Sequence, residues 1–376
     1  MGAEFIHGLP PELLNLVSEA GKEYFELDGR ALCLQDGRLK DCVFGEEFSI
    51  LRDLPEEPDL SFKEWIERQH YPPAAAASAI SYVQGFNAAD ASVIGVKGLA
   101  VQQRAEDAIE GDRLFRVEEG YSALADYLAH KLTAAGGALF LSSPVHKVQW
   151  RRGSVLVESG SNAGVGADAR GQTARRFHAS RCIVTLPLGV LQAGDVLFDP
   201  APRRALEAAG QLAMGNASRI VLVFRERFWE AEYPDASFLF LGDLLPSVWW
   251  TSAPKLTATL TGWVGGPRAR DAAIATKDGL LRESFAALGA AFALPATEIA
   301  NRLLSAHTHD WGTDPFSRGA YSYVPSGAFD AISALAEPLE DTLFFAGEHT
   351  DTTGHWGTVH GALRSGLRAA VQAGNG

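Results

Sequence analysis

The chain has 376 residues, of which 47% are hydrophobic and 38 are glycines, so it is long enough to bury a sizeable core and to form two domains. Its net charge is −13 at pH 7, and residues 1–70, with 16 acidic against 7 basic side chains, carry −9 of it. This balance argues against a nucleic-acid partner, which would need a basic surface, and is compatible with cationic small molecules as partners.

The three cysteines, Cys33, Cys42 and Cys182, are odd in number and widely separated, so the sequence predicts neither a disulfide framework nor a zinc site. The amino terminus shows no secretory leader or myristoylation pattern, and no apolar run reaches the length of a membrane span. We therefore expect a cytoplasmic protein with no membrane partner.

The first part of the chain alternates short strands with helices. The elements predicted before residue 115 are, in chain order, a strand-like run at residues 2–8, hairpins with turns at Asp28-Gly29 and Asp36-Gly37, a helix opened by the capping box Ser61–Glu64, an alanine-rich helix from Pro72 to about Gly85, and a further helix after Asn87. Phe62, Trp65 and Ile66 fall on one side of the capped helix, which predicts that this side packs on a core.

The middle of the chain predicts strands with a few helices between them. The elements are a strand at Phe115 that leads through Gly120 into an amphipathic helix, strands at 138–148, 154–158 and 177–187, a helix at 202–213, strands at 219–224, 237–241, 248–251 and 257–264, a helix at about 279–292 and a strand at about 299–307. His307 lies at the end of the last strand, and His309 would place a second imidazole on the same face, which makes the two histidines a possible metal pair. No carboxylate or thiol accompanies the two at telling spacing, so we predict no metal site.

One glycine-rich segment imitates a nucleotide-binding motif. Gly164-Val-Gly-Ala-Asp-Ala169 has the letters of a GxGxxA fingerprint, but the residues after it lead to another strand. The fingerprint requires a helix at that point, so we predict a hairpin loop instead.

The carboxyl-terminal part predicts a strand, a turn and a helix with a ligand site between them. Leu343 to Ala346 is a short apolar run that ends at Gly347, and Glu348 follows directly. Open α/β sheets bind ligands at the carboxyl ends of their strands. A helix that begins between Gly357 and Val359 would point unpaired N–H groups and the positive end of its dipole at an anionic group. From periodicity alone, a strand, a loop and a tightly packed terminal helix without a ligand explain the stretch equally well.

The residue sequence of this stretch favours the ligand site. Phe345-Ala-Gly-Glu-His-Thr350 and Gly357-Thr-Val-His-Gly-Ala-Leu-Arg-Ser-Gly366 closely resemble the carboxyl-terminal FAD motif of the flavin-dependent amine oxidases, the family of monoamine oxidases, polyamine oxidases and histone lysine demethylases. The resemblance implies that Glu348 contacts the ribityl and pyrophosphate part of FAD and that the helix start at Thr358-Val359 faces the N1/O2 edge of the flavin. It extends over the chain from Gly2 to Ala370.

The resemblance assigns further residues to the cofactor and the substrate. The segment Gly2-Ala3 would pass beside the flavin, and His7 would line the substrate tunnel. The residues that the resemblance places at the cofactor are Gly2, Ala3, Val145, Pro187, Gly347, Glu348, Trp356, Thr358, Val359 and Ala362. Tyr321 would be one aromatic of the amine-binding cage, with Thr358 at its usual partner position and Trp356 close by.

Two family positions hold alanine here. Ala320 stands where mitochondrial monoamine oxidases attach FAD through cysteine, so FAD is expected to be non-covalent. Ala205 stands where many members have a lysine that holds a water at flavin N5. This predicts a slow reaction of the reduced flavin with oxygen and leaves open whether the protein is an oxidase or a dehydrogenase.

The largest departure from the family is the strand, G-x-G-x-x-G turn and helix that bind the pyrophosphate, which this sequence lacks. The expected fold is therefore α/β (α+β), with an FAD-linked reductase-like cofactor domain that lacks its first βαβ unit. It is interleaved with a substrate domain of antiparallel sheet and helices. Residues 1–10, 112–192 and 318–376 would form the cofactor domain, and residues 11–111 and 193–317 the substrate domain.

The function expected from the resemblance is FAD-dependent oxidation of a polyamine-like substrate or a monoamine by hydride transfer to the flavin. Two alternatives stay open. In the first, the chain would be an inactive remnant, or one subunit of a split flavoenzyme whose amino-terminal segment acts in trans. Alternatively, the flavin is retained and the substrate differs, as in an amino-acid oxidase or a desaturase-like enzyme.

Overall fold

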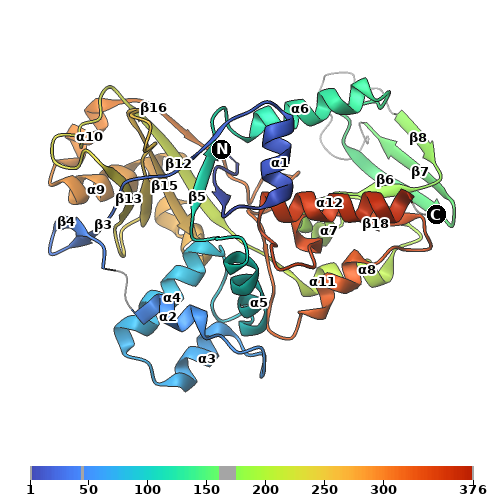
Figure 1. Cartoon of the computed structure of the whole chain (residues 1–376), viewed down its shortest axis with the longest axis horizontal. Coiled ribbons are helices and arrows are strands. Elements are labelled where there is room, and N and C mark those ends of the chain that lie inside the picture. The colour runs from blue at the N-terminus through green and yellow to red at the C-terminus, as the bar shows by residue number, and fades with distance from the viewer. Residues whose placement is uncertain (1, 44–45, 161–174, 375–376) are drawn as a thin grey trace.

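The computed structural model describes residues 2–43, 46–160 and 175–374 of the chain. In Figure 1 a large mixed sheet with its helices lies on the left, a second group of strands and helices around α12 lies on the right, and a cluster of helices lies below. The amino-terminal segment runs between the two larger parts, where β1 (Ile6–His7) pairs with β5 (Leu114–Val117).

A seven-stranded sheet forms the larger part. In spatial order its strands are β16 (Leu303–Thr308), β12 (Ala217–Phe224), β15 (Thr259–Gly265), β14 (Val248–Trp250), β13 (Ala236–Phe240), β3 (Arg30–Gln35) and β4 (Arg38–Asp41). All neighbours are antiparallel except β13 and β3. Alternate residues such as Ile220, Leu222 and Leu260 point to one face and join a core with Leu280 and Leu288 of α9 (Lys277–Phe292). The opposite face is therefore free to line a site.

The β3–β4 hairpin contains a disulfide that the sequence analysis did not predict. Asp36 and Gly37 form the predicted turn, both with positive φ. Behind this turn Cys33 and Cys42 are bonded, with their Cα atoms 5.0 Å apart. The prediction was wrong because it weighed the number and spread of the cysteines, whereas hairpin pairing brings these two together. Disulfides persist mainly in oxidising compartments, so this bond does not support the expected cytoplasmic location.

A cluster of four helices lies beside the sheet. They are α2 (Glu46–Arg52), α3 (Phe62–Gln69), α4 (Pro73–Phe86) and α5 (Val96–Asp107). The predicted cap of α3 is confirmed, since Ser61 Oγ accepts a hydrogen bond from the Glu64 backbone N–H at 3.3 Å. Phe62, Trp65 and Ile66 are buried as expected. The end of α4 reaches β15 of the sheet, where Trp263 Nε1 donates to the carbonyl of Gly85.

The second part combines two small sheets with five helices. A four-stranded sheet has the order β10 (Leu197–Asp199), β6 (Val145–Arg151), β7 (Ser154–Ser159) and β8 (Arg175–Ala179), while β9 (Cys182–Val184) and β18 (Leu343–Phe345) pair in parallel. The helices are α6 (Tyr121–Ala134), α7 (Leu188–Ala193), α8 (Arg203–Gln211), α11 (Asp330–Ala336) and α12 (Val359–Gly374). Leu188, Ala208 and Leu335 meet in the core beneath β18.

The remaining elements are short. They are α1 (Pro11–Glu19), β2 (Tyr24–Glu26), α10 (Ala296–Arg302), the pair β11 (Ala213–Met214) and β17 (Ser322–Tyr323), and the 3-10 helices η1 (Gly266–Arg270), η2 (Ala272–Ile274) and η3 (Glu348–Thr350). Although residues 11–26 and 197–211 were assigned to the substrate domain, α1 contacts α12, and β10 and α8 pack on β6 and α11. The exact domain boundaries stay a prediction.

Three predicted strands need correction. The strand expected at 138–148 begins only at Val145, where pairing with β7 starts. The strand expected at 177–187 is two strands, because β8 pairs with β7 whereas β9 pairs with β18 in another sheet. The first residues of the strand expected at 299–307 belong to α10, which begins after Pro295. The predicted loop at Gly164–Ala169 lies outside the described residues.

Among the described residues no helix is both long and apolar enough to cross a membrane.

Candidate functional site

The ends of two parallel strands define one edge of the candidate site. Pro187 follows β9 and Gly347 follows β18, and both strands run in the same direction. Gly347 has a φ of 135°, and a Cβ there would lie 2.6 Å from the ring of His349. Glycine is thus required for the tight turn that places Glu348 at this edge. The structure brings these predicted residues together at the place where α/β sheets bind ligands.

Glu348 links three segments at this edge. Its Oε2 accepts hydrogen bonds from Gly357 N at 2.6 Å and from Ser322 Oγ at 2.7 Å, and its Oε1 accepts one from Ser322 N at 3.1 Å. Hydrogen bonds to a charged acceptor are stronger than those between neutral groups. The carboxylate therefore fixes the loop before α12 and the strand after Tyr321. Its predicted contact with the cofactor stays a prediction.

The first turn of α12 is capped by Thr358. Its hydroxyl donates to the carbonyl of His355 at 2.6 Å and accepts from Gly361 N at 3.0 Å. The remaining N–H groups of this turn have no acceptor within the helix, so the turn is suited to a negatively charged group. The side chain of Val359 packs on the core formed by α1 and β5, and Ala362 follows one turn later. A cofactor would meet the backbone of this helix start.

Tyr321 forms an aromatic wall with Trp263, a residue that the sequence analysis did not single out. The two rings lie with their planes 7° apart and their centroids 6.4 Å apart. The Tyr321 hydroxyl donates to the carbonyl of Phe86, next to the carbonyl of Gly85 that Trp263 binds. Burial, and then the charge of Glu348, raise the pKa of Tyr321, so the phenol stays protonated and keeps this bond.

His7 packs on the ring of Phe86. Its ring meets the Phe86 ring edge to face, with 5.5 Å between the centroids. Burial lowers the pKa of His7, and the charge of Glu106 opposes this shift. A pocket lined by Tyr82, Phe86, Glu106 and neighbouring residues adjoins these rings. Its walls combine aromatic and aliphatic surface with the amides of Asn87 and Gln102 and the carboxylate of Glu106.

Trp356 points into the protein core. Only 4% of its surface is exposed, and its ring meets Phe329 edge to face at 6.4 Å. The nearest aromatic partner of Tyr321 recorded among the described residues is Trp263 instead. The predicted role of Trp356 at the cofactor and in the amine cage stays a prediction.

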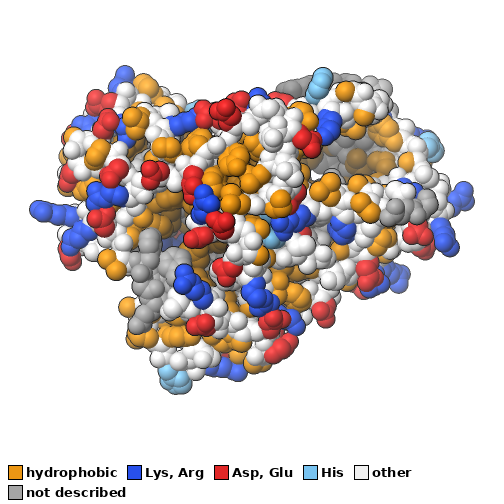
Figure 2. All heavy atoms as spheres, in the orientation of Figure 1, with side chains coloured by type: hydrophobic (Ala, Val, Ile, Leu, Met, Phe, Trp, Pro, Cys, Tyr) orange, Lys and Arg blue, Asp and Glu red, His pale blue; other side chains and the backbone are white. Residues whose placement is uncertain are grey.

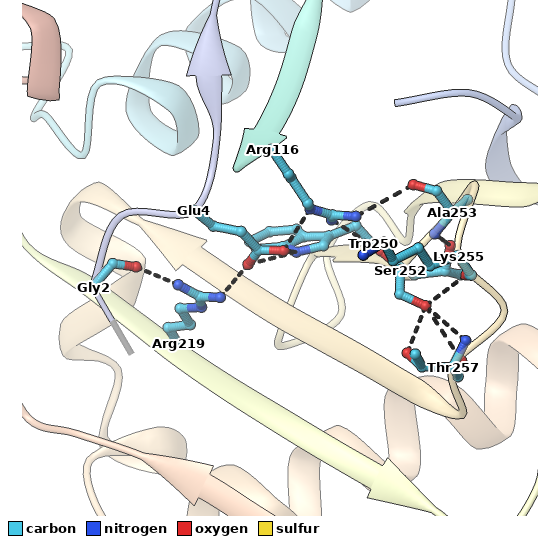
Figure 3. A network of polar contacts seen from close by, with 10 residues as sticks. Gly2, Glu4, Arg116, Arg219, Trp250, Ser252, Ala253, Lys255 and Thr257 are labelled. Atoms are coloured by element: carbon cyan, nitrogen blue, oxygen red, sulfur yellow. Dashed lines mark hydrogen bonds and ion pairs between the residues drawn. The ribbon is translucent and has the colours of Figure 1, made fainter. Parts of the chain in front are cut away.

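A buried ionic network holds the amino-terminal segment on the open face of the large sheet (Figure 3). Glu4 lies between Arg116 and Arg219, with Arg116 Nε 2.8 Å from its carboxylate and Arg219 donating to it. Trp250 Nε1 also donates to Glu4, at 3.2 Å from each oxygen. Arg219 reaches the carbonyl of Gly2 as well.

This network decides where the segment from Gly2 through Ala3 to His7 lies. Arg116 donates to the carbonyls of Thr251 and Ala253 at 3.0 and 3.3 Å, which ties the network to the sheet. Breaking a buried ion pair on one side leaves a charge without compensation. The sequence analysis could not predict the network, because its members are far apart in the chain.

The two alanine positions and Val145 are placed as follows. Ala205 is 1% exposed and packs inside α8 among apolar residues. Ala320 N donates to the carbonyl of Gly215 at 2.9 Å, beside Tyr321. Val145 begins β6 and is half-buried beside the same core as Ala205. The cofactor role predicted for Val145 stays a prediction.

Two groups of histidines differ in their surroundings. His307 of β16 contacts Ser305 at 3.1 Å, and His309, which follows this strand, pairs with Asp314 at 2.7 Å, so the two histidines have separate partners. His355 and His360 instead lie side by side with Glu106. Burial lowers the pKa of His360 to about 2, with the neighbouring His355 adding to the effect, so His360 is neutral.

Comparison with known proteins places this geometry in a family. The family model described as flavin containing amine oxidoreductase matches residues 2–373. Lysine-specific histone demethylase 2 of Homo sapiens is 29% identical over 263 residues, which cover 67% of this chain and 29% of that protein. The peroxisomal N(1)-acetyl-spermine/spermidine oxidase of Bos taurus is 27% identical over 278 residues, 67% of this chain and 53% of that protein.

This chain spans only part of these curated relatives. A lysine-specific histone demethylase 1 homolog 2 from Oryza sativa subsp. japonica is 32% identical over 207 residues, and the match covers 52% of this chain and 26% of that protein. The shares of the human and bovine proteins are 29% and 53%.

Solved structures share the fold. Wild-type putrescine oxidase bound to putrescine superposes with a TM-score of 0.80 at 20% identity, covering 98% of this chain and 87% of that one. Cyclohexylamine oxidase from Brevibacterium oxydans IH-35A gives a TM-score of 0.78 at 18% identity, with 99% and 87% covered. At these identities the likeness establishes the fold alone, and it confirms the predicted α/β class with mixed sheets.

Proposed function

The chain belongs to the family of flavin-containing amine oxidoreductases, and from this premise we propose that it oxidises an amine with non-covalent FAD as its cofactor. FAD, when bound, accepts the hydride equivalent from the carbon beside the amine nitrogen. The protein has to bind the amine, orient that carbon and exclude water. The proposed substrate is a polyamine-like amine or a monoamine, as the names of the bovine relative and of the two solved oxidases suggest.

The aromatic wall of Tyr321 and Trp263 is the observation that carries this proposal. Aromatic faces can pack against an aliphatic amine and keep water from it. The Tyr321 hydroxyl is already bound to the Phe86 carbonyl, so the ring has one fixed orientation. His7 and the pocket beside Phe86 extend the wall. Binding and orientation are thus attributed to side chains of α4, β1, β15 and the segment before β17.

The residues present fit the flavin end of FAD better than its phosphates. Pro187 and Gly347 at the strand ends and the free N–H groups of the α12 start suit a ring edge that becomes negatively charged. Among the described residues and in the sequence, no G-x-G-x-x-G turn between a strand and a helix supplies the phosphate cradle.

A second candidate function follows from this gap. We propose that the chain can also act as one part of a flavoenzyme whose nucleotide-binding segment is supplied separately. The observation that favours it is exposed apolar surface beside β9 and α12, where Ile183, Leu367 and Val371 are 39%, 60% and 61% exposed. Such surface usually marks a contact with another segment or protein.

The test of the proposed function uses Tyr321 variants of the chain joined to the nucleotide-binding unit of a relative. Tyr321→Ala removes the ring and is expected to lower kcat/KM for amines about tenfold, since aromatic contacts contribute roughly 0.5–1.5 kcal/mol. Flavin content, read from absorbance, should not change. Turnover is measured with oxygen and with an artificial electron acceptor, because Ala205 stands at the position of the family's lysine.

Tyr233→Phe is the matched control. It removes a hydroxyl that binds Glu232 at the surface, whereas Tyr321→Phe removes the hydroxyl bound to Phe86. Tyr321→Phe should alter amine turnover, and Tyr233→Phe should not. Equal kcat/KM values for wild type and Tyr321→Ala on both polyamines and monoamines would remove the aromatic wall from the site.

A further inference from the structure

Three side chains from distant parts of the chain converge at the edge of the pocket that Phe86 and Glu106 line. Glu106 lies near the end of α5, His355 precedes α12, and His360 lies in its first turn. His355 Nδ1 is 3.1 Å from His360 Nε2 and 3.8 Å from Glu106 Oε1, and one ligand atom from each residue lies within 4.8 Å of the others. The two imidazoles are 3% and 1% exposed.

These distances are those of a nearly formed metal site. Ligand atoms about 2.0–2.1 Å from a tetrahedral Zn²⁺ are roughly 3.3 Å apart. The separations of 3.1 and 3.8 Å lie on both sides of this value, and all three ligand atoms lie within 4.8 Å of one another, so the Glu106 carboxylate has to move closer to the imidazoles to seat an ion. Two histidines and one glutamate are also a ligand set that zinc uses in sites with an open fourth position.

Two glycines make room for the cluster. A Cβ on Gly361 would lie 2.0 Å from the carbonyl oxygen of His355, and a Cβ on Gly111 would lie 2.4 Å from a carboxylate oxygen of Glu106. Any side chain at either position would displace a ligand.

The backbone around His355 is fixed as well. The Asp351 carboxylate accepts a hydrogen bond from His355 N at 2.8 Å, and Thr358 holds the carbonyl of His355. A site built on an anchored loop and the start of a helix loses little entropy when it binds an ion.

We propose that Glu106, His355 and His360 bind one divalent transition-metal ion of the zinc type, next to the pocket that Glu106 also lines. The imidazoles supply nitrogen lone pairs and Glu106 supplies a carboxylate oxygen. The site goes beyond amine oxidation, which requires no metal from these residues.

A bound ion would join the helical cluster to the segment around α12. Glu106 belongs to the helical cluster, whereas His355 and His360 belong to the segment around α12. Because the ion binds the folded chain and not the separated ligands of an unfolded one, it should stabilise the fold in proportion to its concentration above the dissociation constant.

The experiment uses Zn²⁺ and Co²⁺ with the monomer fraction of the full chain after metal removal by chelation. We expect one Zn²⁺ per chain by elemental analysis after gel filtration, and visible absorption from Co²⁺ in a four-coordinate site. Loss of contacts in the outer shell of metal sites typically costs 10–100-fold in affinity, so removal of a direct ligand in Glu106→Gln or His360→Gln should cost at least that much. These readouts require neither flavin nor amine turnover.

His309→Gln is the matched control, because it removes a histidine that also faces a carboxylate, Asp314, outside the cluster. It should leave the Zn²⁺ content and the Co²⁺ spectrum unchanged. Glu106→Gln is the decisive variant if His360→Gln fails to fold, since it keeps the size of the side chain. Unchanged Zn²⁺ affinity in Glu106→Gln, or loss of binding in His309→Gln alone, would overturn the proposal.

Discussion

At the scale of single residues, His349 is one source of pH dependence. It is 2% exposed, and its Nε2 has no hydrogen-bond partner among the described residues. Burial lowers its pKa, although the charge of Glu348 opposes the shift. The pKa of this imidazole in the unfolded chain is 6.5. Below this pH the unfolded chain binds a proton that the folded chain does not bind, so the free energy of unfolding decreases as the pH falls from about 7.

We predict that His349→Gln weakens this dependence. One group contributes at most about 1.4 kcal/mol per pH unit, and the variant should lose that share of the slope between pH 6.5 and 5. Urea unfolding at several pH values measures how the free energy of unfolding changes with pH. His130→Gln, which removes an exposed imidazole on α6, is the control and should keep the slope of the wild type. Parallel stability curves for His349→Gln and wild type would show that another group is responsible.

At the scale of elements, the β3–β4 hairpin forms one end of the large sheet, and Cys33–Cys42 holds it closed. We predict that alkylation of the unreduced, denatured protein labels only Cys182 and that prior reduction exposes all three thiols. Closing a loop of this length stabilises the fold by about 2–3 kcal/mol in the chain-entropy account. Reduction should therefore speed hydrogen exchange in β4 while β12 stays protected. Three reactive thiols without reduction would contradict the pairing.

Elements with strong local signals were predicted from the sequence, and those decided by distant partners were not. The cap at Ser61, the turn at Asp36 and the helix start near Val359 depend on neighbouring residues, and all three are confirmed. The single strand expected at 177–187 is wrong, because an apolar run does not reveal that its two halves pair with different sheets.

At the scale of the whole molecule, the candidate site combines residues that only the fold brings together. Glu348 and Thr358 are in one local motif, so sequence resemblance could find them. Trp263 was missed because its role depends on facing Tyr321 across the boundary between the two parts. Glu4 was missed for the same reason, since its partners come from β5 and β12. The motif therefore located the residues at the strand ends and at the start of α12 better than the aromatic wall of Tyr321 and Trp263.

The same scale shows where apolar surface is exposed around the candidate site. Among the described residues, β9 and β18 form a parallel pair without further strands, although parallel sheets are normally covered and extended. Figure 2 shows a hollow with hydrophobic side chains between α6 and α12. Large hydrophobic residues exposed on these elements are Leu128 and Leu132 of α6, Leu139 after it, Ile183 of β9, and Leu367 and Val371 of α12.

We predict that the 376-residue chain, purified alone, self-associates as its concentration rises and carries little flavin. Exposed apolar surface drives association, and the loss of several phosphate hydrogen bonds at roughly 1.5–3 kcal/mol each weakens FAD binding by several powers of ten. Leu367 and Val371 lie one helical turn apart on α12, so the double change to glutamate should reduce association in light scattering without altering the fold. Leu256→Glu, at an equally exposed residue outside this surface, should not reduce association.

Joining a nucleotide-binding unit to the amino terminus should both restore a monomer and give stoichiometric flavin absorbance. If the unsupplemented chain is already monomeric and yellow, the α12 start and Glu348 edge hold FAD without a phosphate cradle, and the proposal of a separately supplied segment fails.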